Sequence, residues 1–315
     1  MTRLMVGYLV CAFLGTLAAP VAAQPSGYVV NAADPTDDGS HDNLWRVNLA
    51  DGQASRIGPL NVRGTVNSDV EGLALETGAF LYGVDDATDS LIGIDIASGS
   101  SITFDERPTD NLRLNLDGSP LDPGLALDCD GRLLMTSTTR RTLYSLNKTT
   151  GQASVIGREG SLGVRIGDLA VRGTDVVGIG VDGDEGLYAI DAAAGTATRI
   201  GSFGIDIALA KAGLDFDTSG NLWAVGHIVD NEGQPQPSRI LRIDRATGAA
   251  TLGPTTLTGV KSLSITPVRC GGFSTPPPPR GDAPIGTPVN SPLALLFLII
   301  ASLAGAWFSR RFMRA

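Results

Sequence analysis

The stretch Leu187–Gly201, LYAIDAAAGTATRIG, sets a pattern that recurs through the rest of the chain. A short alternating run ends at Asp191, Gly195 follows four residues later, and a second alternating run closes on Ile200 and Gly201. Two strands joined by a tight turn fit this pattern. The Asp side chain can accept hydrogen bonds from N–H groups of the turn, and glycine supplies the positive φ that other residues resist.

Four more segments carry the same pattern: Leu44–Gly58, Leu91–Phe104, Leu143–Gly157 and Ile240–Gly253. The residue at the position of Asp191 is Asn48, Asp95, Asn147 or Asp244, and the turn glycine is Gly52, Gly99, Gly151 or Gly248. Successive copies begin about 44 to 53 residues apart, which is the spacing of four-stranded propeller blades. The repeat therefore predicts the fold and says little about chemistry.

Two further strand-like runs precede most copies, as Glu71–Leu75 and Phe80–Val84 do in the second. The first copy has only Tyr28–Asn31 before it, and Ser262–Thr266 follows the fifth copy without a blade of its own. We therefore predict an all-β, five-bladed β-propeller within residues 24–272, in which the C-terminal strand completes the first blade and removes the open sheet edges. The expected blades are 259–268 with 27–58, then 68–104, 121–157, 165–201 and 209–253. A sixth blade hidden near Pro108–Pro120 is the alternative.

The two ends of the chain carry export features. Residues 1–23 are typical of a signal peptide, with Arg3, an apolar run and small residues before Gln24. Residues 273–287 contain four consecutive prolines and predict an extended linker. In residues 288–315, the uncharged run Leu293–Phe308 precedes three arginines and predicts an apolar helix that holds the domain outside the inner membrane. We expect a periplasmic or cell-surface protein.

The arrangement of this last segment, a Pro-bearing motif at Thr287–Pro292, an apolar helix and terminal arginines, resembles C-terminal sorting signals of the PEP-CTERM and IPTL-CTERM type. The signature tetrapeptides themselves are not matched. The resemblance implies an exosortase-like processing enzyme as a partner, and an ordinary membrane anchor is the alternative.

The predicted domain is acidic. Residues 24–279 contain 19 basic and 32 acidic residues, a net charge of −13, so nucleic acid is not expected as a partner. Cys129 and Cys270 lie in an oxidising compartment, where a disulfide is allowed. They fall in blades that are not neighbours in the predicted ring, which favours two free thiols over a bond.

The topology predicts that one face of the ring, around the entrance of the central channel, is acidic. We place Asp69, Glu71, Asp122 and Asp168 near this entrance, together with Arg165, Lys211 and Lys261. Clustered carboxylates suit a hard cation such as Ca²⁺, so the four acids are candidate metal ligands. Acidic loop residues that cap turns and keep the surface soluble are the plainer interpretation.

Glu71-Gly72 at the head of an inner strand, followed by LYGVDDATDSLIGID, resembles the first blade of calcium-dependent gluconolactonases. This resemblance implies a metal-ligating role for Glu71. The blades as a whole resemble secreted repeat propellers of the NHL and YVTN type, which are mostly binding or structural modules, and fold alone does not fix an activity.

Other candidate motifs are weak. His41 and His227 are the only histidines and both fall on the acidic face, where a base or a metal ligand is conceivable and a chance placement is the simpler interpretation. The usual hydrolase and thiol motifs are absent. We therefore expect a module that binds a ligand or partner through the acidic face. The alternatives are a Ca²⁺-dependent lactonase-like hydrolase and a structural envelope or matrix protein.

Overall fold

The computed structural model describes residues 24–31, 42–62, 65–66, 69–76, 80–104, 110–114, 119–230 and 232–270. These residues form strands and turns and contain no helix. None of their elements could therefore cross a membrane as an apolar helix. The predicted signal peptide, the linker and the C-terminal segment lie outside the described residues.

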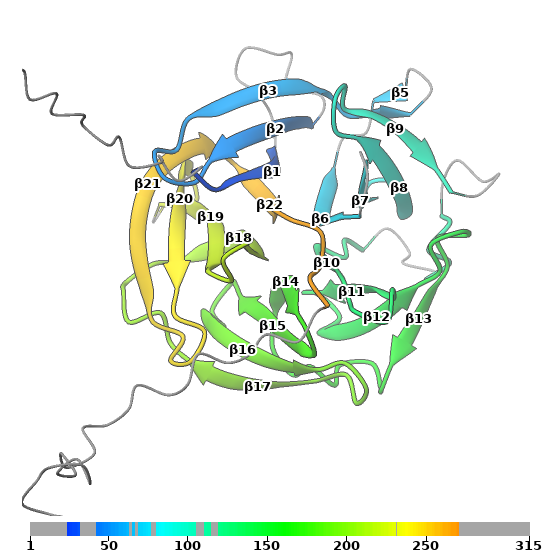
Figure 1. The fold of residues 1–315 in the computed structure, drawn as a ribbon. Helices are drawn as coiled ribbons and strands as arrows, with labels where there is room; N and C mark the ends of the chain where they lie inside the picture. Colours follow the sequence, from blue (N-terminus) through cyan, green and yellow to red (C-terminus); the bar gives the residue numbers. More distant parts are fainter. Residues whose placement is uncertain are drawn as a thin grey trace, which may run out of the picture. The chain divides into compact units, whose positions relative to one another are not determined.

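The described strands form five sheets around a centre, and the four strands of each blade are antiparallel (Figure 1). From the centre outward, blade one contains β22 (Val260–Ser264), β1 (Ser26–Asn31), β2 (Asn43–Asn48) and β3 (Ala54–Pro59). Blade two contains β6 (Val70–Leu75), β7 (Phe80–Asp85), β8 (Ser90–Asp95) and β9 (Ser100–Thr103). Blade three contains β10 (Pro123–Leu127), β11 (Leu133–Ser137), β12 (Thr142–Leu146) and β13 (Ala153–Ile156).

Blade four contains β14 (Ile166–Arg172), β15 (Asp175–Gly180), β16 (Gly186–Asp191) and β17 (Thr196–Gly201). Blade five contains β18 (Leu209–Phe216), β19 (Leu222–Val229), β20 (Pro235–Ile243) and β21 (Ala250–Thr258). Two short strands that the sequence pattern did not indicate, β4 (Asn61–Val62) and β5 (Thr65–Val66), extend blade two at its outer edge. β4 pairs with β9 in parallel.

The ring closes as predicted. β22 pairs with β1 in antiparallel register, with Val29 opposite Leu263, so the last strand is the inner strand of the first blade. The inner strands contact one another in the order β22, β6, β10, β14, β18 and back to β22. The molecule is a five-bladed β-propeller.

The repeat turns form as the sequence predicts. In blade four, Asp191 Oδ1 accepts hydrogen bonds of 2.9 Å from the N–H groups of Ala193 and Ala194, and Gly195 has a φ of 69°. Both bonds also form at Asp95, Asn147 and Asp244, and Asn48 accepts the first of the two, from the N–H of Ala50. Each turn glycine also donates its N–H to the carbonyl of its capping residue.

In three of the five copies, the closing glycine is required by contact between blades. A Cβ on Gly201, at the end of β17, would collide with the carbonyl oxygen of Thr247 in the repeat turn of blade five. Gly157 meets the carbonyl of Ala194 in the same way between blades three and four. The outer edge of one blade thus lies against the repeat turn of the next. The closing glycine of the repeat is therefore explained by packing between neighbouring blades.

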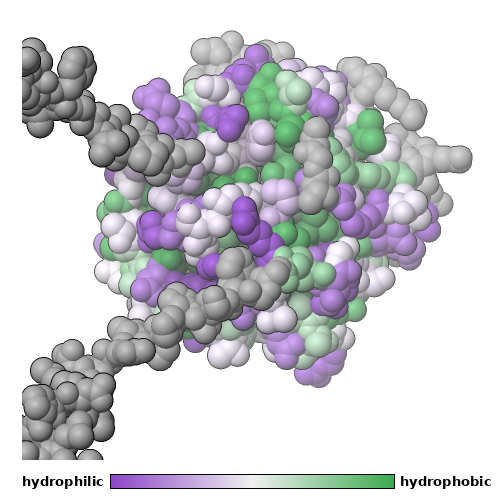
Figure 2. All heavy atoms as spheres, in the orientation of Figure 1, coloured by the Kyte–Doolittle hydropathy of each residue, from purple (hydrophilic) through white to green (hydrophobic). Residues whose placement is uncertain are grey.

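The hydrophobic core lies in the interfaces between neighbouring blades. Leu187 of blade four and Leu214 and Leu241 of blade five, for example, belong to one buried cluster. The described large hydrophobic side chains that are exposed, Ile102, Val155 and Leu252, lie on the outer strands β9, β13 and β21. The face drawn in Figure 2 carries hydrophilic and hydrophobic residues side by side.

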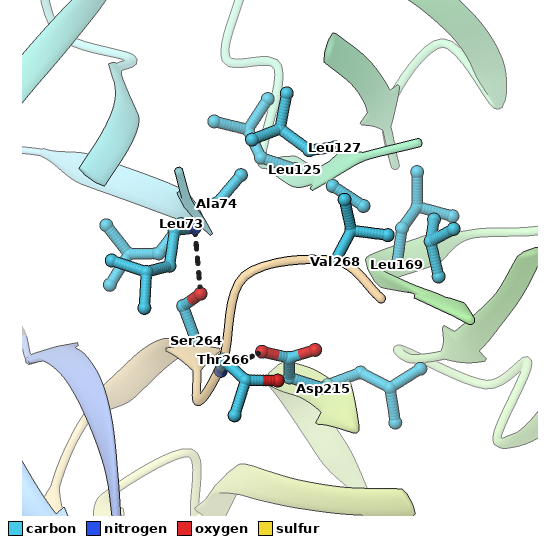
Figure 3. A pocket seen from close by; sticks show the side chains of 13 residues that line it. Leu73, Ala74, Leu125, Leu127, Leu169, Asp215, Ser264, Thr266 and Val268 are labelled. Carbon is cyan, nitrogen blue, oxygen red and sulfur yellow. Dashed lines mark hydrogen bonds between the residues drawn. The ribbon is translucent and has the colours of Figure 1, made fainter. Parts of the chain in front are cut away.

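After β22 the chain crosses the end of the channel as a short segment, residues 265–270, which we call the strap (Figures 1 and 3). The N–H groups of Ile265 and Thr266 donate to Asp215 Oδ2, at 2.6 and 3.3 Å. Farther along, Arg269 accepts a hydrogen bond from Gly173 of blade four. Together with the ends of the inner strands, the strap lines a cavity of about 20 Å³, room for roughly one water molecule. The strap therefore narrows this end of the channel.

The strap ends in a disulfide between Cys129 and Cys270. The expectation of two free thiols was therefore wrong. It assumed that Cys270 stays with blade one, whereas the strap carries it across the ring to the β10–β11 turn of blade three. Val268 packs against the clusters on both sides of that blade, which fixes this path.

Candidate functional site at the channel entrance

The open end of the channel is formed by the beginnings of the inner strands. Glu71 is the second residue of β6, Asp122 directly precedes β10, and Lys211 and Lys261 lie near the beginnings of β18 and β22. These residues are far apart in sequence, and ring closure alone brings them together. The strap lies at the other ends of the same strands, so the site lies at the end of the channel opposite the strap.

Lys211 is the centre of the first group. Its Nζ contacts Glu71 Oε1 and lies 2.8 Å from Asp122 Oδ1. The Glu71 side chain is only 3% exposed, whereas Lys211 and Asp122 are 29% and 30% exposed. One carboxylate oxygen from each of Glu71, Asp86 and Asp122 lies within 4.8 Å of the other two. An ammonium ion is therefore held among buried and half-buried carboxylates.

Local backbone features place these side chains. Gly72 has a φ of 55°, and the register of β6 against β7 shifts between Glu71 and Leu73. This irregularity lets Gly72 approach the backbone of Pro123 and Leu125 in the next blade, where a Cβ would not fit. In the pair Glu71-Gly72, the glutamate supplies the carboxylate and the glycine forms the bulge that positions it.

Lys261 forms a second group beside the first. Its Nζ lies 2.9 Å from Asp42 Oδ2 and 2.6 Å from Asp69 Oδ1. Lys261 and Asp42 are almost completely buried, and Asp69 is 39% exposed. The charges of Lys261 and Asp69 also act on Glu71, so the two groups form one electrostatic network.

The network holds more acids than bases: five carboxyl groups, on Asp42, Asp69, Glu71, Asp86 and Asp122, face two lysines. Burial raises the pKa of Glu71 to about 8 and that of Asp42 to about 6, although the lysines oppose both shifts. Burial favours loss of the proton from Lys211, but Glu71 and Asp122 outweigh it and raise the pKa of this lysine. At neutral pH Glu71 therefore retains its proton, while Asp42 is mostly ionised and both lysines remain charged.

The carboxylates offer the oxygen donors that Ca²⁺ requires, but the arrangement does not fit the ion. Ca²⁺ takes six to eight oxygen ligands. Lys211 Nζ lies among the three clustered acids. Both Asp86 oxygens accept hydrogen bonds of 3.0 Å from the N–H of Leu121, and one also accepts the N–H of Asp122. The site as folded holds an ammonium group in the place of a metal.

Asp168 is not part of this group. It is fully buried, Oδ1 accepts N–H groups from Leu125 and Leu169, and Oδ2 accepts the N–H of Leu214. Its carboxylate thus joins the inner strands of blades three, four and five. Asp168 does not belong to the cluster of Glu71, Asp86 and Asp122, because its carboxylate oxygens accept hydrogen bonds from the neighbouring backbones.

The other candidates take separate positions. Arg165 turns outward and pairs with Asp182 at 3.3 Å. His227 lies on β19 opposite Lys211, and burial and the two lysines lower its pKa. His41 lies outside the described residues. Asp42 and Asp86 were not predicted as members of the lysine network, because their place in it depends on how the loops fold over the strand beginnings.

Comparison with known proteins finds only distant similarities, all to solved structures. No protein-family model matches the chain, and no curated protein matches it. Among solved structures, it is similar to a chain of the nidogen–laminin complex, with 12% identity over 78% of this chain and 100% of that chain and a TM-score of 0.44. It is also similar to a 6-phosphogluconolactonase-like protein of Bacteroides fragilis, with 11% identity, 79% and 100% coverage and a TM-score of 0.42.

A gluconolactonase of Xanthomonas campestris is similar at 15% identity, over 78% of this chain and 96% of that chain, with a TM-score of 0.37. At these identities and scores the resemblances do not bear on activity or ligand.

Proposed function

We propose that the protein is an exported binding module, held at the membrane by its C-terminal segment, and that its site is the channel entrance. The ligand it takes there carries a cationic group, most simply an organic ammonium. The observation that supports this proposal is the half-exposed Lys211 ammonium held between Glu71 and Asp122. The site already accommodates one ammonium group, that of Lys211. Because its carboxyl groups outnumber its lysines, it can balance the charge of a second cation.

The exposed parts of the network indicate where the ligand binds. Asp69 and Asp122 retain 39% and 30% of their side-chain exposure, whereas Glu71 and Asp42 lie beneath them. A cation that enters from solvent therefore meets Asp69 and Asp122 first. The positive charge of the ligand favours the ionised forms of Glu71 and Asp42, which lie deeper in the site. At a pH under about 8, binding therefore releases a proton from Glu71.

The test is a melting-temperature series on the full chain with spermidine, with the neutral polyol sorbitol as control. A ligand present at about 100 times its dissociation constant stabilises the folded state by about 2.7 kcal/mol. We expect spermidine to raise the melting temperature, and its affinity to increase from pH 6 to pH 8. Asp122→Asn and Asp69→Asn should reduce the shift, while Asp51→Asn, in the repeat turn of blade one, should not. Absence of any spermidine shift at pH 8 would refute the proposal.

The second candidate is a Ca²⁺-dependent, lactonase-like hydrolase, favoured by the three clustered acids Glu71, Asp86 and Asp122. It requires Lys211 to leave the cluster. Millimolar Ca²⁺ should then stabilise the wild-type chain and support lactone hydrolysis that Glu71→Gln abolishes. Under the binding-module proposal, Ca²⁺ stabilises only a variant such as Lys211→Ala, in which the ammonium is gone.

A further inference from the structure

A second site lies at the opposite end of the propeller, in a groove of about 580 Å³ between blades one and five. It is lined by the turn after β18, by β2, and by the beginning of the strap at Ile265 and Thr266. The side chains that define its chemistry are Ser26, Arg46, Asp217, Asn221, Trp223 and Arg242. Its volume lies in the range of small-molecule sites.

Both arginines of the groove are exposed, and other side chains hold them in place. Arg242 lies over the Trp223 ring, 5.3 Å from its centroid, and donates to Asn221 Oδ1. Arg46 donates from Nε and Nη2 to Ser26 Oγ, at 3.1 and 3.0 Å. Each guanidinium has five N–H donors, so each keeps donors for a ligand after these contacts.

The carboxylate that lines the groove is already engaged. Asp217 is 7% exposed, and its Oδ1 accepts the N–H groups of Ser219 and Asn221. Its Oδ2 accepts Trp223 Nε1 at 2.9 Å and Asn221 Nδ2 at 2.7 Å. These bonds hold the pKa of Asp217 below its usual value, although burial opposes them. Asp217 therefore positions the indole beneath Arg242, and its oxygens are not directed at the arginines.

From this geometry we propose that the groove binds a small organic anion, with a carboxylate or a phosphate held between Arg46 and Arg242. Planar guanidinium groups pair in a bidentate manner with both kinds of oxyanion. The hydroxyl groups of Ser26 and Ser219 supply neutral polar contacts for the rest of a sugar-sized molecule. The site is distinct from the channel entrance in position and in sign of charge, so it does not depend on the function proposed above.

The experiment is isothermal titration of the full chain with glucuronate, glucose 6-phosphate and glucose. Glucuronate and glucose 6-phosphate distinguish a carboxylate from a phosphate ligand, and glucose is the neutral control. We expect saturable binding of at least one anion and none of glucose. Arg242→Gln and Arg46→Gln should each weaken binding about 10-fold or more, the loss expected for a charge-assisted hydrogen bond. Arg158→Gln, an exposed arginine outside the groove, should leave affinity unchanged.

A further variant separates recognition from folding. Arg242→Lys keeps the positive charge but lacks the planar fork, so it should weaken anion binding while the melting temperature stays at the wild-type value. The proposal is overturned if neither anion binds, if glucose binds equally well, or if both glutamine variants retain wild-type affinity.

Discussion

The Cys129–Cys270 disulfide should contribute a large share of the stability of the ring. The two cysteines are 141 residues apart in sequence, so the bond closes a loop that spans blades three, four and five and the inner strand of blade one. Loop-closure entropy for a crosslink of this length gives about 5 kcal/mol, and removal of native disulfides typically costs about 2 to 5 kcal/mol. For a domain of this size, 1 kcal/mol corresponds to about 2 to 4 °C in melting temperature.

We therefore expect Cys270→Ala to lower the melting temperature by about 4 to 20 °C, measured by circular dichroism. Cys129→Ala, the double variant and the reduced wild-type chain should all match it, because each lacks the same crosslink. Hydrogen exchange supplies an independent measure, since the N–H of Gly173 donates to Arg269 of the strap and should exchange faster without the bond. The reasoning fails if the single variants melt within about 2 °C of the wild-type protein.

Three other perturbations test the network and the packing of the blades. Asp168→Ala removes the acceptor of three buried N–H groups and should cost about 3 kcal/mol or more in urea unfolding, whereas Asp175→Ala, on an exposed residue, should cost far less. Glu71 holds its proton up to a pKa of about 8 in the folded chain against an ordinary 4.5, so its contribution to stability is present in full below pH 4.5 and is lost as pH rises through 8. Urea unfolding should show this decline between pH 5 and pH 8.5, with a smaller decline in Glu71→Gln, and an equal decline in both would contradict the assignment. Gly201→Ala should cost about 1 to 3 kcal/mol by overpacking against Thr247, with Ser202→Ala unchanged as its control in the same assay.

The ring was predictable because its determinants are local and repeated. Each turn needs an Asp or Asn acceptor and a glycine with positive φ, so the pattern around Asp191 and Gly195 is visible within a few residues. Closure by β22 followed from counting strands on either side of the first and fifth copies. The expected positions of Glu71, Lys211 and Lys261 then followed from the topology, because the inner strands of a closed ring all begin at the same face.

Features that depend on the path of an irregular segment were not predictable. Cys270 lies six residues beyond the end of β22, and no repeat indicates that these residues cross the channel. The strap follows the buried contacts of Val268 and the hydrogen bonds to Asp215, which carry no sequence signature. Asp168 was misplaced for a similar reason: periodicity places it on an inner strand but does not show that it joins backbones of three blades.

The two ends of the channel differ in the residues that line them. The inner strands carry charged residues at their beginnings, whereas most of their central residues are small or apolar. The central positions, such as Gly124, Leu125 and Ala126 of β10, are small or apolar and allow close packing against the next blade. Charged residues can be accommodated at the strand beginnings, where Lys211 and Lys261 reach carboxylates on other blades. At the strand ends the strap covers the apolar side chains and separates the entrance from the Arg46 and Arg242 groove. A substitution at one end should therefore leave ligand affinity at the other unchanged, and a measured coupling between them would show that the strap transmits strain along the axis.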